Sequence, residues 1–282
     1  MLSDAFLSRL DTLRLAMRGR ASGGAGGVRR SRQLGSSAEF SDYREYIPGD
    51  DIRRLDWNAL ARFDRLFVKL FMEEQESVVT ILLDASASMS EKWDVAVQAA
   101  EALGYLALTG GDRLRVICLR GQGNRVSPPL AGRPAYARLE SFLRACAPEG
   151  EGTLTEAVKQ AQGLQKGLCF LISDCYQDQG IGPALDYLRY CRQECGVVQV
   201  LSAFEMDPAL DGAWRLQDSE TGAEMPLLAD RGAMAAYART LQSFLSKTQA
   251  ACRSREATYL LLDGRQSFEE NFIPSLSRSM MI

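Results

Sequence analysis

The feature that most constrains the fold is a series of short apolar runs that alternate with helical patterns from residue 76 onward. Strands separated by helices usually run parallel and are covered on both faces. The sequence therefore predicts an α/β domain with a doubly wound, mostly parallel sheet. The expected strands are 77–83, 113–119, 168–173, 197–204 and 257–262, the expected helices are 92–109, 135–147, 154–164, 181–195, 234–253 and 268–277, and 207–228 is expected to form an inserted hairpin.

A different kind of sequence precedes this domain. With 282 residues and 46% hydrophobic content the chain is long enough for a sizeable core. Residues 2–17 have apolar side chains at helical spacing, which predicts an amphipathic helix that packs on the body of the protein. We therefore expect residues 1–75 to hold this helix, an Arg-rich loop and a charged segment, and residues 76–282 to form the α/β domain.

Composition excludes several functions. The formal charge of −3 gives no general attraction to nucleic acid or to an anionic membrane. The chain has no histidine, so it has no Ser-His-Asp or Cys-His machinery, and nucleophilic hydrolysis would need a Lys or carboxylate base, which argues against a hydrolase. Seven cysteines without metal-type spacing indicate reduced thiols. Reduced thiols lead us to expect a cytoplasmic location, and no apolar run is long enough to cross a membrane.

The Gly-rich stretch "GRASGGAGGVRRSR" at residues 19–32 carries most of a basic cluster. It has two interpretations: it grips an acidic partner or nucleic acid, or it is a mobile, solvated loop. It lacks the Lys-Ser/Thr pair of a nucleotide-binding loop. The arginines concerned are Arg18, Arg20, Arg29, Arg30 and Arg32.

Residues 39–65 interleave acids with arginines and contain no lysine. Arginine pairs bidentately with carboxylates, so this composition predicts a lattice of ion pairs, with Pro48 and Gly49 in a turn and with Trp57 anchored on apolar surface. The segment is either a structural clasp or a face that binds a partner. Its candidate residues are Arg44, Tyr46, Asp50, Asp51, Arg53, Asp56, Trp57 and Arg62.

Three loops of the expected α/β domain are rich in polar side chains. In a parallel sheet, ligands bind at the carboxyl ends of the strands. The loops are "DASAS" from residue 84, "GTLT" from residue 152 and "SDCYQD" from residue 173. Oxygen donors without nitrogen or thiolate suit a hard divalent cation. Helix capping is the alternative for Ser88 and Ser90 and the favoured role of Thr155. The candidate metal ligands are Asp84, Ser86, Ser88, Thr153 and Asp174.

These loops resemble the metal-ion-dependent adhesion site of von Willebrand factor A domains. The resemblance implies that Ser86 and Ser88 bind Mg²⁺ or Mn²⁺ directly, that Thr153 binds directly or through water, and that Asp84 and Asp174 bind mostly through water. Separately, "YREYIPGDDIRRLDWNALAR" resembles the signature of the bacterial family called domain of unknown function 58, whose members carry an A-type domain. The two resemblances together cover roughly residues 39–282.

These resemblances imply a non-enzymatic, metal-dependent module for protein–protein interaction, whose cation receives an Asp or Glu of a client protein. They also imply an adaptor or chaperone-like role beside a MoxR-type AAA+ ATPase. Two alternatives stay open. Asp84 could be the nucleophile of a Mg²⁺-dependent phosphatase, although such enzymes carry a second Asp where this chain has Ser86. The Arg-rich loop could bind nucleic acid or an anionic surface.

Overall fold

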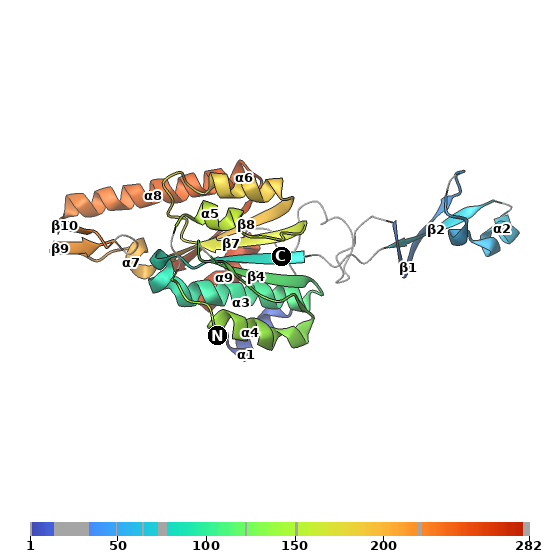
Figure 1. The fold of residues 1–282 in the computed structure, drawn as a ribbon, viewed down its shortest axis with the longest axis horizontal. Coiled ribbons are helices and arrows are strands. Elements are labelled where there is room, and N and C mark those ends of the chain that lie inside the picture. The colour runs from blue at the N-terminus through green and yellow to red at the C-terminus, as the bar shows by residue number, and fades with distance from the viewer. Residues whose placement is uncertain are drawn as a thin grey trace. The chain divides into compact units, whose positions relative to one another are not determined.

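The computed structural model describes residues 2–13, 34–48, 50–63, 65–72, 78–121, 123–149, 152–218 and 222–278 (Figure 1). The described chain forms two compact units. The smaller one lies within residues 19–76, and the larger one combines the first helix with the chain from residue 77 onward. The sequence led us to expect a division after residue 75, with the first helix in the smaller unit. In the structure this helix belongs to the larger unit.

The larger unit is built on one mainly parallel sheet of seven strands. The strand order is β11-β8-β7-β3-β4-β5, and β6 also pairs with β4. The first five strands are parallel to their neighbours, whereas the two short strands β5 and β6 are antiparallel to β4. The strands are β3 Val78–Asp84, β4 Arg113–Leu119, β5 Arg125–Val126, β6 Leu130–Ala131, β7 Gly167–Ser173, β8 Gln193–Ser202 and β11 Thr258–Gly264.

Helices cover both faces of this sheet, with α1, α3, α4 and α9 on one side and α5, α6 and α8 on the other (Figure 1). The mixed α/β class with a mainly parallel central sheet is therefore confirmed. The helices are α1 Asp4–Leu10, α3 Trp93–Thr109, α4 Tyr136–Arg144, α5 Leu154–Lys159, α6 Gly182–Tyr190, α7 Ala203–Met206, α8 Arg231–Arg253 and α9 Phe268–Arg278, with the short 3₁₀ segments η2 Ala87–Lys92 and η3 Arg133–Ala135.

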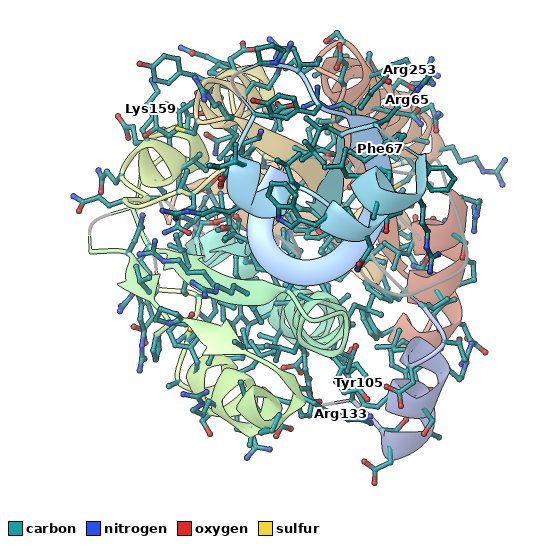
Figure 2. The ribbon with its side chains drawn as sticks, turned by 90° about the vertical axis from the view of Figure 1, so that its right-hand side faces the viewer. Arg65, Phe67, Tyr105, Arg133, Lys159 and Arg253 are labelled. Carbon is teal, nitrogen blue, oxygen red and sulfur yellow. The ribbon has the colours of Figure 1, made fainter. Side chains whose placement is uncertain are left out.

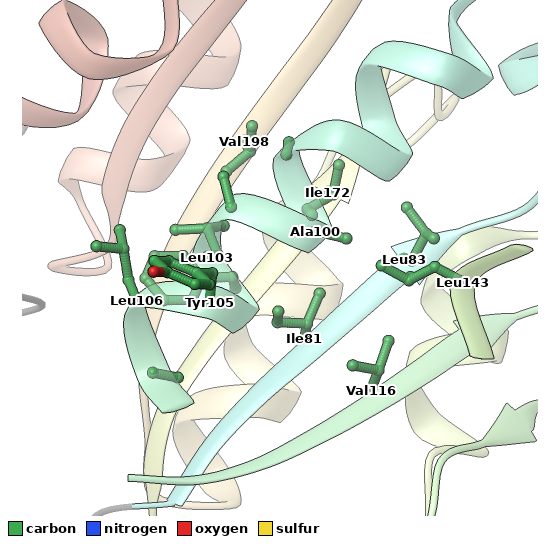
Figure 3. Close-up of a cluster of buried hydrophobic side chains, with 14 of the residues drawn as sticks. Ile81, Leu83, Ala100, Leu103, Tyr105, Leu106, Val116, Leu143, Ile172 and Val198 are labelled. Carbon is green, nitrogen blue, oxygen red and sulfur yellow. The ribbon is translucent and has the colours of Figure 1, made fainter. Parts of the chain in front are cut away.

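The sheet has a hydrophobic core on each of its two faces, because successive side chains of a strand point to opposite faces. In β3, Ile81 and Leu83 face the α3 side, while Leu82 faces the α5–α6 side. Figure 3 shows the α3 side, where Leu103 and Leu106 lie close to the strands. Because both faces are covered by apolar helix surface, every residue of β3 after Val78 is buried.

The first helix belongs to the core on the α3 side. Phe6 and Leu10 are fully buried. The chain that follows α1 is held by Asp11, which accepts hydrogen bonds from Tyr105 Oη at 2.7 Å and Arg133 Nη2 at 3.2 Å. Figure 2 shows Tyr105 and Arg133 side by side. The expected packing of this helix on the body of the protein is thus found for residues 4–10.

The helix expected over 181–195 is too long. Helix α6 ends at Tyr190, and Arg192 adopts a left-handed backbone with φ of 58°, which turns the chain directly into β8. Cys191 and Cys195 therefore do not share a helix, because Cys195 lies in β8. All seven cysteines are free thiols.

The inserted hairpin expected over 207–228 is present as β9 Gly212–Gln217 and β10 Glu224–Ala229, which pair antiparallel. The smaller unit contains a second antiparallel pair, β1 Leu34–Glu45 with β2 Phe67–Met72. Between them lie the 3₁₀ turn η1 Ile52–Arg54 and α2 Trp57–Phe63. Within the described residues no helix is long and apolar enough to cross a membrane.

Candidate functional site

The loop after β3 is organised by the carboxylate at the end of that strand. Asp84 is 4% exposed. Its Oδ1 accepts the backbone N–H of Ser86 at 3.0 Å, and its Oδ2 accepts the hydroxyl of Ser173 at 2.6 Å. Ser173 ends the neighbouring strand β7, so these two bonds tie two strand ends together. Asp84 therefore fixes the backbone of the serine loop.

Two hydroxyl groups of this loop face each other. Ser86 Oγ and Ser88 Oγ are 3.1 Å apart. The side chain of Ser86 makes no capping bond to η2, and Ser90 donates its hydroxyl to Ala87 O at 2.7 Å. The N-cap position of α3 is Lys92, which makes no side-chain capping bond. Helix capping by Ser88 or Ser90, considered from the sequence, is therefore wrong.

Asp174 follows β7 and brings a second carboxylate to the same edge of the sheet. Its Oδ1 accepts the N–H of Tyr176 at 3.1 Å, and Gln199 of β8 donates to its backbone carbonyl at 2.8 Å. Cys175 adopts a left-handed backbone with φ of 65°, and its N–H donates to Ser173 Oγ. These contacts hold Asp174, which is 2% exposed, in a tight turn beside Asp84.

A buried lysine lies in the middle of this cluster and was not predicted from the sequence. Lys92 is 2% exposed, and its Nζ is 3.0 Å from Asp174 Oδ2 and in contact with Glu205 Oε1. The ammonium also lies 5.1 Å from the ring centroid of Tyr176. One cation therefore joins the loop after β7 to α7.

Glu205 holds its position through the start of α7. Its Oε2 accepts the N–H of Ser202 at 2.7 Å while Ser202 Oγ accepts the N–H of Glu205, a reciprocal capping box. The Tyr237 hydroxyl donates to its carbonyl at 2.6 Å. Glu205 follows the strand β8, so the rule that identified Asp84 and Asp174 from strand ends would also have found it.

The site holds more negative than positive charge. Among the described residues, Asp174 and Glu205 pair with the ammonium of Lys92, and Asp84 lies beside Asp174. Burial, and then repulsion from Asp174, raise the pKa of Asp84 to about 6. Asp174 Oδ2 is close enough to Lys92 for an ion pair, but it accepts no hydrogen bond from the described residues. A second cation would therefore be favourable here.

These donors fit a divalent cation in part. Two hydroxyls 3.1 Å apart and two carboxylates provide only oxygen, as Mg²⁺ prefers. The described residues contain no group of three His, Cys, Asp or Glu side chains placed to share one metal ion. A cation bound at this edge would therefore depend on Ser86 and Ser88 as well as on carboxylates.

Thr153 is not joined to this cluster. It is the N-cap of α5, where its Oγ1 accepts the N–H of Glu156 at 3.3 Å and donates to Glu156 Oε2 at 3.0 Å. Among the described residues no hydrogen bond links it to Asp84 or to the serines. The capping role expected for Thr155 belongs to Thr153 instead, because Thr153 has the extended backbone that a capping residue needs.

In the smaller unit, the acids of the signature segment act mainly on their own backbone. Asp50 accepts Arg44 Nη2 at 2.7 Å and the N–H of Ile47 at 2.9 Å. Asp51 caps η1 by accepting the N–H of Arg53 at 3.0 Å. The Arg44–Asp50 pair is thus one member of the expected ion-pair lattice, and Asp51 is used as a cap.

Asp56 organises the second half of the segment. Its Oδ1 accepts the N–H groups of Asn58 and Ala59 at the start of α2, and its Oδ2 accepts the Tyr43 hydroxyl at 2.8 Å.

Trp57 is 65% exposed, so it is not anchored on apolar surface as expected. Tyr46 is half-buried and its N–H donates to Leu66 O, whereas Arg53 and Arg62 are exposed and have no ion-pair partner among the described residues. Gly49 and the Arg-rich loop at residues 18–32 lie outside the described residues.

The fold and this edge of the sheet define an α/β domain whose strand ends gather a charged, oxygen-rich cluster. The chain belongs to the family described as "Protein of unknown function DUF58", which matches residues 42–243. "Uncharacterized protein Rv1480" of Mycobacterium tuberculosis (strain ATCC 25618 / H37Rv) is 30% identical over 229 residues, covering 76% of this chain and 70% of that protein. "Uncharacterized protein Mb1516" of Mycobacterium bovis matches equally.

Two solved structures are similar at low identity. The conserved hypothetical protein BatB from Bacteroides thetaiotaomicron has a TM-score of 0.42 and 15% identity, covering 72% of this chain and 98% of that one. An aerotolerance-related membrane protein from Bacteroides fragilis NCTC 9343 has a TM-score of 0.44 and 14% identity, covering 72% and 99%.

Proposed function

We propose that this chain is a von Willebrand A-like module that binds a partner protein through a divalent cation. The observation that carries the proposal is the convergence of Asp84, Ser86, Ser88 and Asp174 at the carboxyl ends of β3 and β7. In α/β sheets, ligands bind outside the carboxyl ends of adjacent parallel strands such as these. The two hydroxyls add no negative charge, so a bound cation keeps its attraction for a further carboxylate.

Each group has a distinct part in this proposal. Ser86 and Ser88 offer neutral oxygens, and Asp174 offers a carboxylate already balanced in part by Lys92. Asp84 is already bonded through both oxygens, so it orients the loop and acts through water or through its charge. A bound Mg²⁺ or Mn²⁺ would supply an open coordination position for an Asp or Glu of the partner.

The partner we propose is a MoxR-type AAA+ ATPase together with a client protein that offers the acidic residue. Membership of the DUF58 family and the resemblance stated above support this choice. The signature segment is a second contact candidate, because Trp57, Arg53 and Arg62 are exposed there. Aromatic and arginine side chains are the types that contribute most to protein interfaces.

Metal titration tests the cation site. Mg²⁺ or Mn²⁺ should raise the melting temperature of the wild type, because a ligand that binds only the folded state stabilises it. The double variant Ser86→Ala/Ser88→Ala should lose this rise. Ser90→Ala is the matched control, since the Ser90 hydroxyl donates to Ala87 O in the same loop. Calorimetry that finds no metal binding by the wild type would rule the proposal out.

The geometry gives less support to the phosphatase alternative. A nucleophilic Asp needs an accessible oxygen, whereas Asp84 is buried and both of its oxygens accept hydrogen bonds. Phosphatase activity on a small phosphoester that disappears in Asp84→Asn would nevertheless establish it. Salt-sensitive nucleic-acid binding that is lost on deleting residues 18–32 would establish the other alternative.

A further inference from the structure

Two cysteines lie together in a small buried cluster next to the serine loop. Cys118 lies near the end of β4, and Cys146 follows α4. Both pack with Ala85, the residue directly after Asp84, and the thiol of Cys146 donates to the carbonyl of Phe142 at 3.3 Å. Their exposed fractions are 1% and 7%, so Cys146 is the one nearer to solvent.

The surroundings of Cys146 are electropositive. The guanidinium of Arg125 lies 5.6 Å from the ring centroid of Phe142, and its Nη1 donates to the carbonyl of Ala145, the residue before Cys146. Arg120 lies on the same side and pairs with Glu149 at 2.9 Å. The Cys118 thiol and these two arginines lower the pKa of Cys146. Thiolates in such surroundings are the reactive form of cysteine.

Other cysteines of the chain lie in the opposite situation. Burial raises the pKa of Cys169 and Cys175, and it raises the pKa of Cys195 and Cys252 to about 12. These thiols lie in the apolar core between the sheet and α5, α6 and α8. The pKa of Cys118 is raised as well, so the chain combines one thiol with a lowered pKa, a protonated thiol next to it, and several thiols buried elsewhere.

We propose that Cys146 and Cys118 form a peroxide-sensitive dithiol that closes to a disulfide beside the cation site. The Cys146 thiolate attacks hydrogen peroxide, the O–O bond breaks, and the products are the Cys146 sulfenic acid and, after protonation, water. The Cys118 sulfur then attacks the Cys146 sulfur, and the hydroxyl group leaves as a second water. Peroxide is reduced by two electrons and the two thiols are oxidised.

The bond would connect two parts of the molecule that flank the site. Cys118 is fixed in the sheet, where Leu119 O accepts the N–H of Ala85 at 3.0 Å. Cys146 begins the segment that leads to Thr153 and α5. Closing the disulfide would restrict that segment relative to the end of β3. The dithiol itself does not depend on whether a metal binds at the serine loop.

Thiol counting and peptide mapping on the full chain test this proposal. The native protein is treated with hydrogen peroxide, its remaining thiols are blocked with N-ethylmaleimide, and it is digested without reductant. We expect the loss of two of the seven thiols, recovery of both with dithiothreitol, and one crosslinked peptide pair that joins Cys118 to Cys146. An unchanged count of seven, or a bond between other cysteines, would overturn the proposal.

Single variants separate the two roles. In Cys118→Ser and Cys118→Ala the sulfenic acid of Cys146 should persist and be trapped by dimedone, whereas Cys146→Ser should keep all its remaining thiols. Cys252→Ser is the control, because its thiol is buried elsewhere, and it should still lose two. Mapping on the wild type decides the matter even if a variant fails to fold. Dimedone labelling of Cys118 in Cys146→Ser would reverse the assigned roles and contradict the proposal.

Discussion

Asp84 and Asp50 are the same residue type in two units of one chain, and their environments shift the pKa in opposite directions. Burial and the neighbouring Asp174 raise the pKa of Asp84 to about 6. The N–H of Ile47 and the guanidinium of Arg44 lower the pKa of Asp50. A carboxylate that closes a turn and pairs with arginine is satisfied, whereas one buried beside a like charge gains from binding a cation.

The contrast extends to the positive partners. In the smaller unit, Asp50 pairs with an arginine that is partly solvated, and the two side chains are 39% and 21% exposed. At the strand ends, Lys92 is buried with Asp174 and reaches Glu205 as well. The first arrangement contributes little to stability, and the second depends on every member being present. Four substitutions test this difference, beginning with the largest effect.

Lys92→Met should be the most damaging. It leaves the buried Asp174 and the half-buried Glu205 without their cation, and removing one partner of a buried pair typically costs about 3–5 kcal/mol in the free energy of unfolding. Urea denaturation measures the loss. Lys159→Met is the control, because that side chain is exposed at the end of α5 (Figure 2). A Lys92 variant as stable as the control would show that the buried cluster is not a charge-balanced unit.

The same variant also bears on the metal. If a divalent cation binds beside Asp174, Mg²⁺ should raise the melting temperature of Lys92→Met by more than it raises that of the wild type, since the ion then replaces a missing charge. An equal or smaller rise would place any bound metal away from Asp174.

Strand-end reasoning predicted much of this arrangement and missed part of it. It expected Asp84, Ser86, Ser88 and Asp174 at the edge of the sheet, where the structure has them, because an apolar run has to end at that edge and the next residues then lie there. Glu205 follows the same rule after β8, but the expected strand ran through residue 204 and hid the one-turn helix α7.

Other features had no local signal. Lys92 precedes Trp93 at the start of an amphipathic pattern, and in the sequence it looks like a solvated side chain. Only the fold shows that carboxylates lie next to it. The antiparallel strands β5 and β6 have two residues each, too short for a period of alternation. The motif could not decide the role of Thr153, since a threonine at the start of a helix can accept hydrogen bonds from backbone amides as readily as it can bind a metal.

Asp84→Asn should have the second largest effect, with a sign that depends on pH. Because the folded pKa of about 6 lies above the ordinary 3.8, the folded wild type holds the proton more tightly, and its stability falls as pH rises from about 4 to about 7. Without metal, the variant should be more stable than the wild type at pH 8, by at most about 3 kcal/mol. Thermal unfolding across this pH range measures it, and a variant that is less stable at pH 8 would contradict the repulsion.

Asp56→Ala should have an intermediate effect limited to the smaller unit. It removes the cap of α2 and the acceptor of the Tyr43 hydroxyl, for which about 1–2 kcal/mol is typical. Hydrogen exchange of the α2 amides measures this loss, and the metal-induced rise in melting temperature should stay that of the wild type. Asp51→Ala is the milder comparison, since it caps only the short η1. Weaker metal binding in Asp56→Ala would show that the signature segment contributes to the cation site.

Asp50→Asn should have the smallest effect and the opposite pH dependence to Asp84→Asn. A lowered pKa means that the charged form of Asp50 stabilises the fold above its ordinary pKa of 3.8, and that this contribution disappears as pH falls through the lowered value. The variant should therefore be slightly less stable than the wild type at pH 7, by an amount that shrinks with added salt because the Arg44 pair is partly solvated. The difference between the two proteins should shrink as pH falls through the lowered pKa of Asp50. Exchange rates of the Ile47 amide, which donates to Asp50, give the most local readout. If Asp50→Asn and Asp84→Asn responded to pH in the same direction, the two carboxylates would not differ in the way that their surroundings indicate.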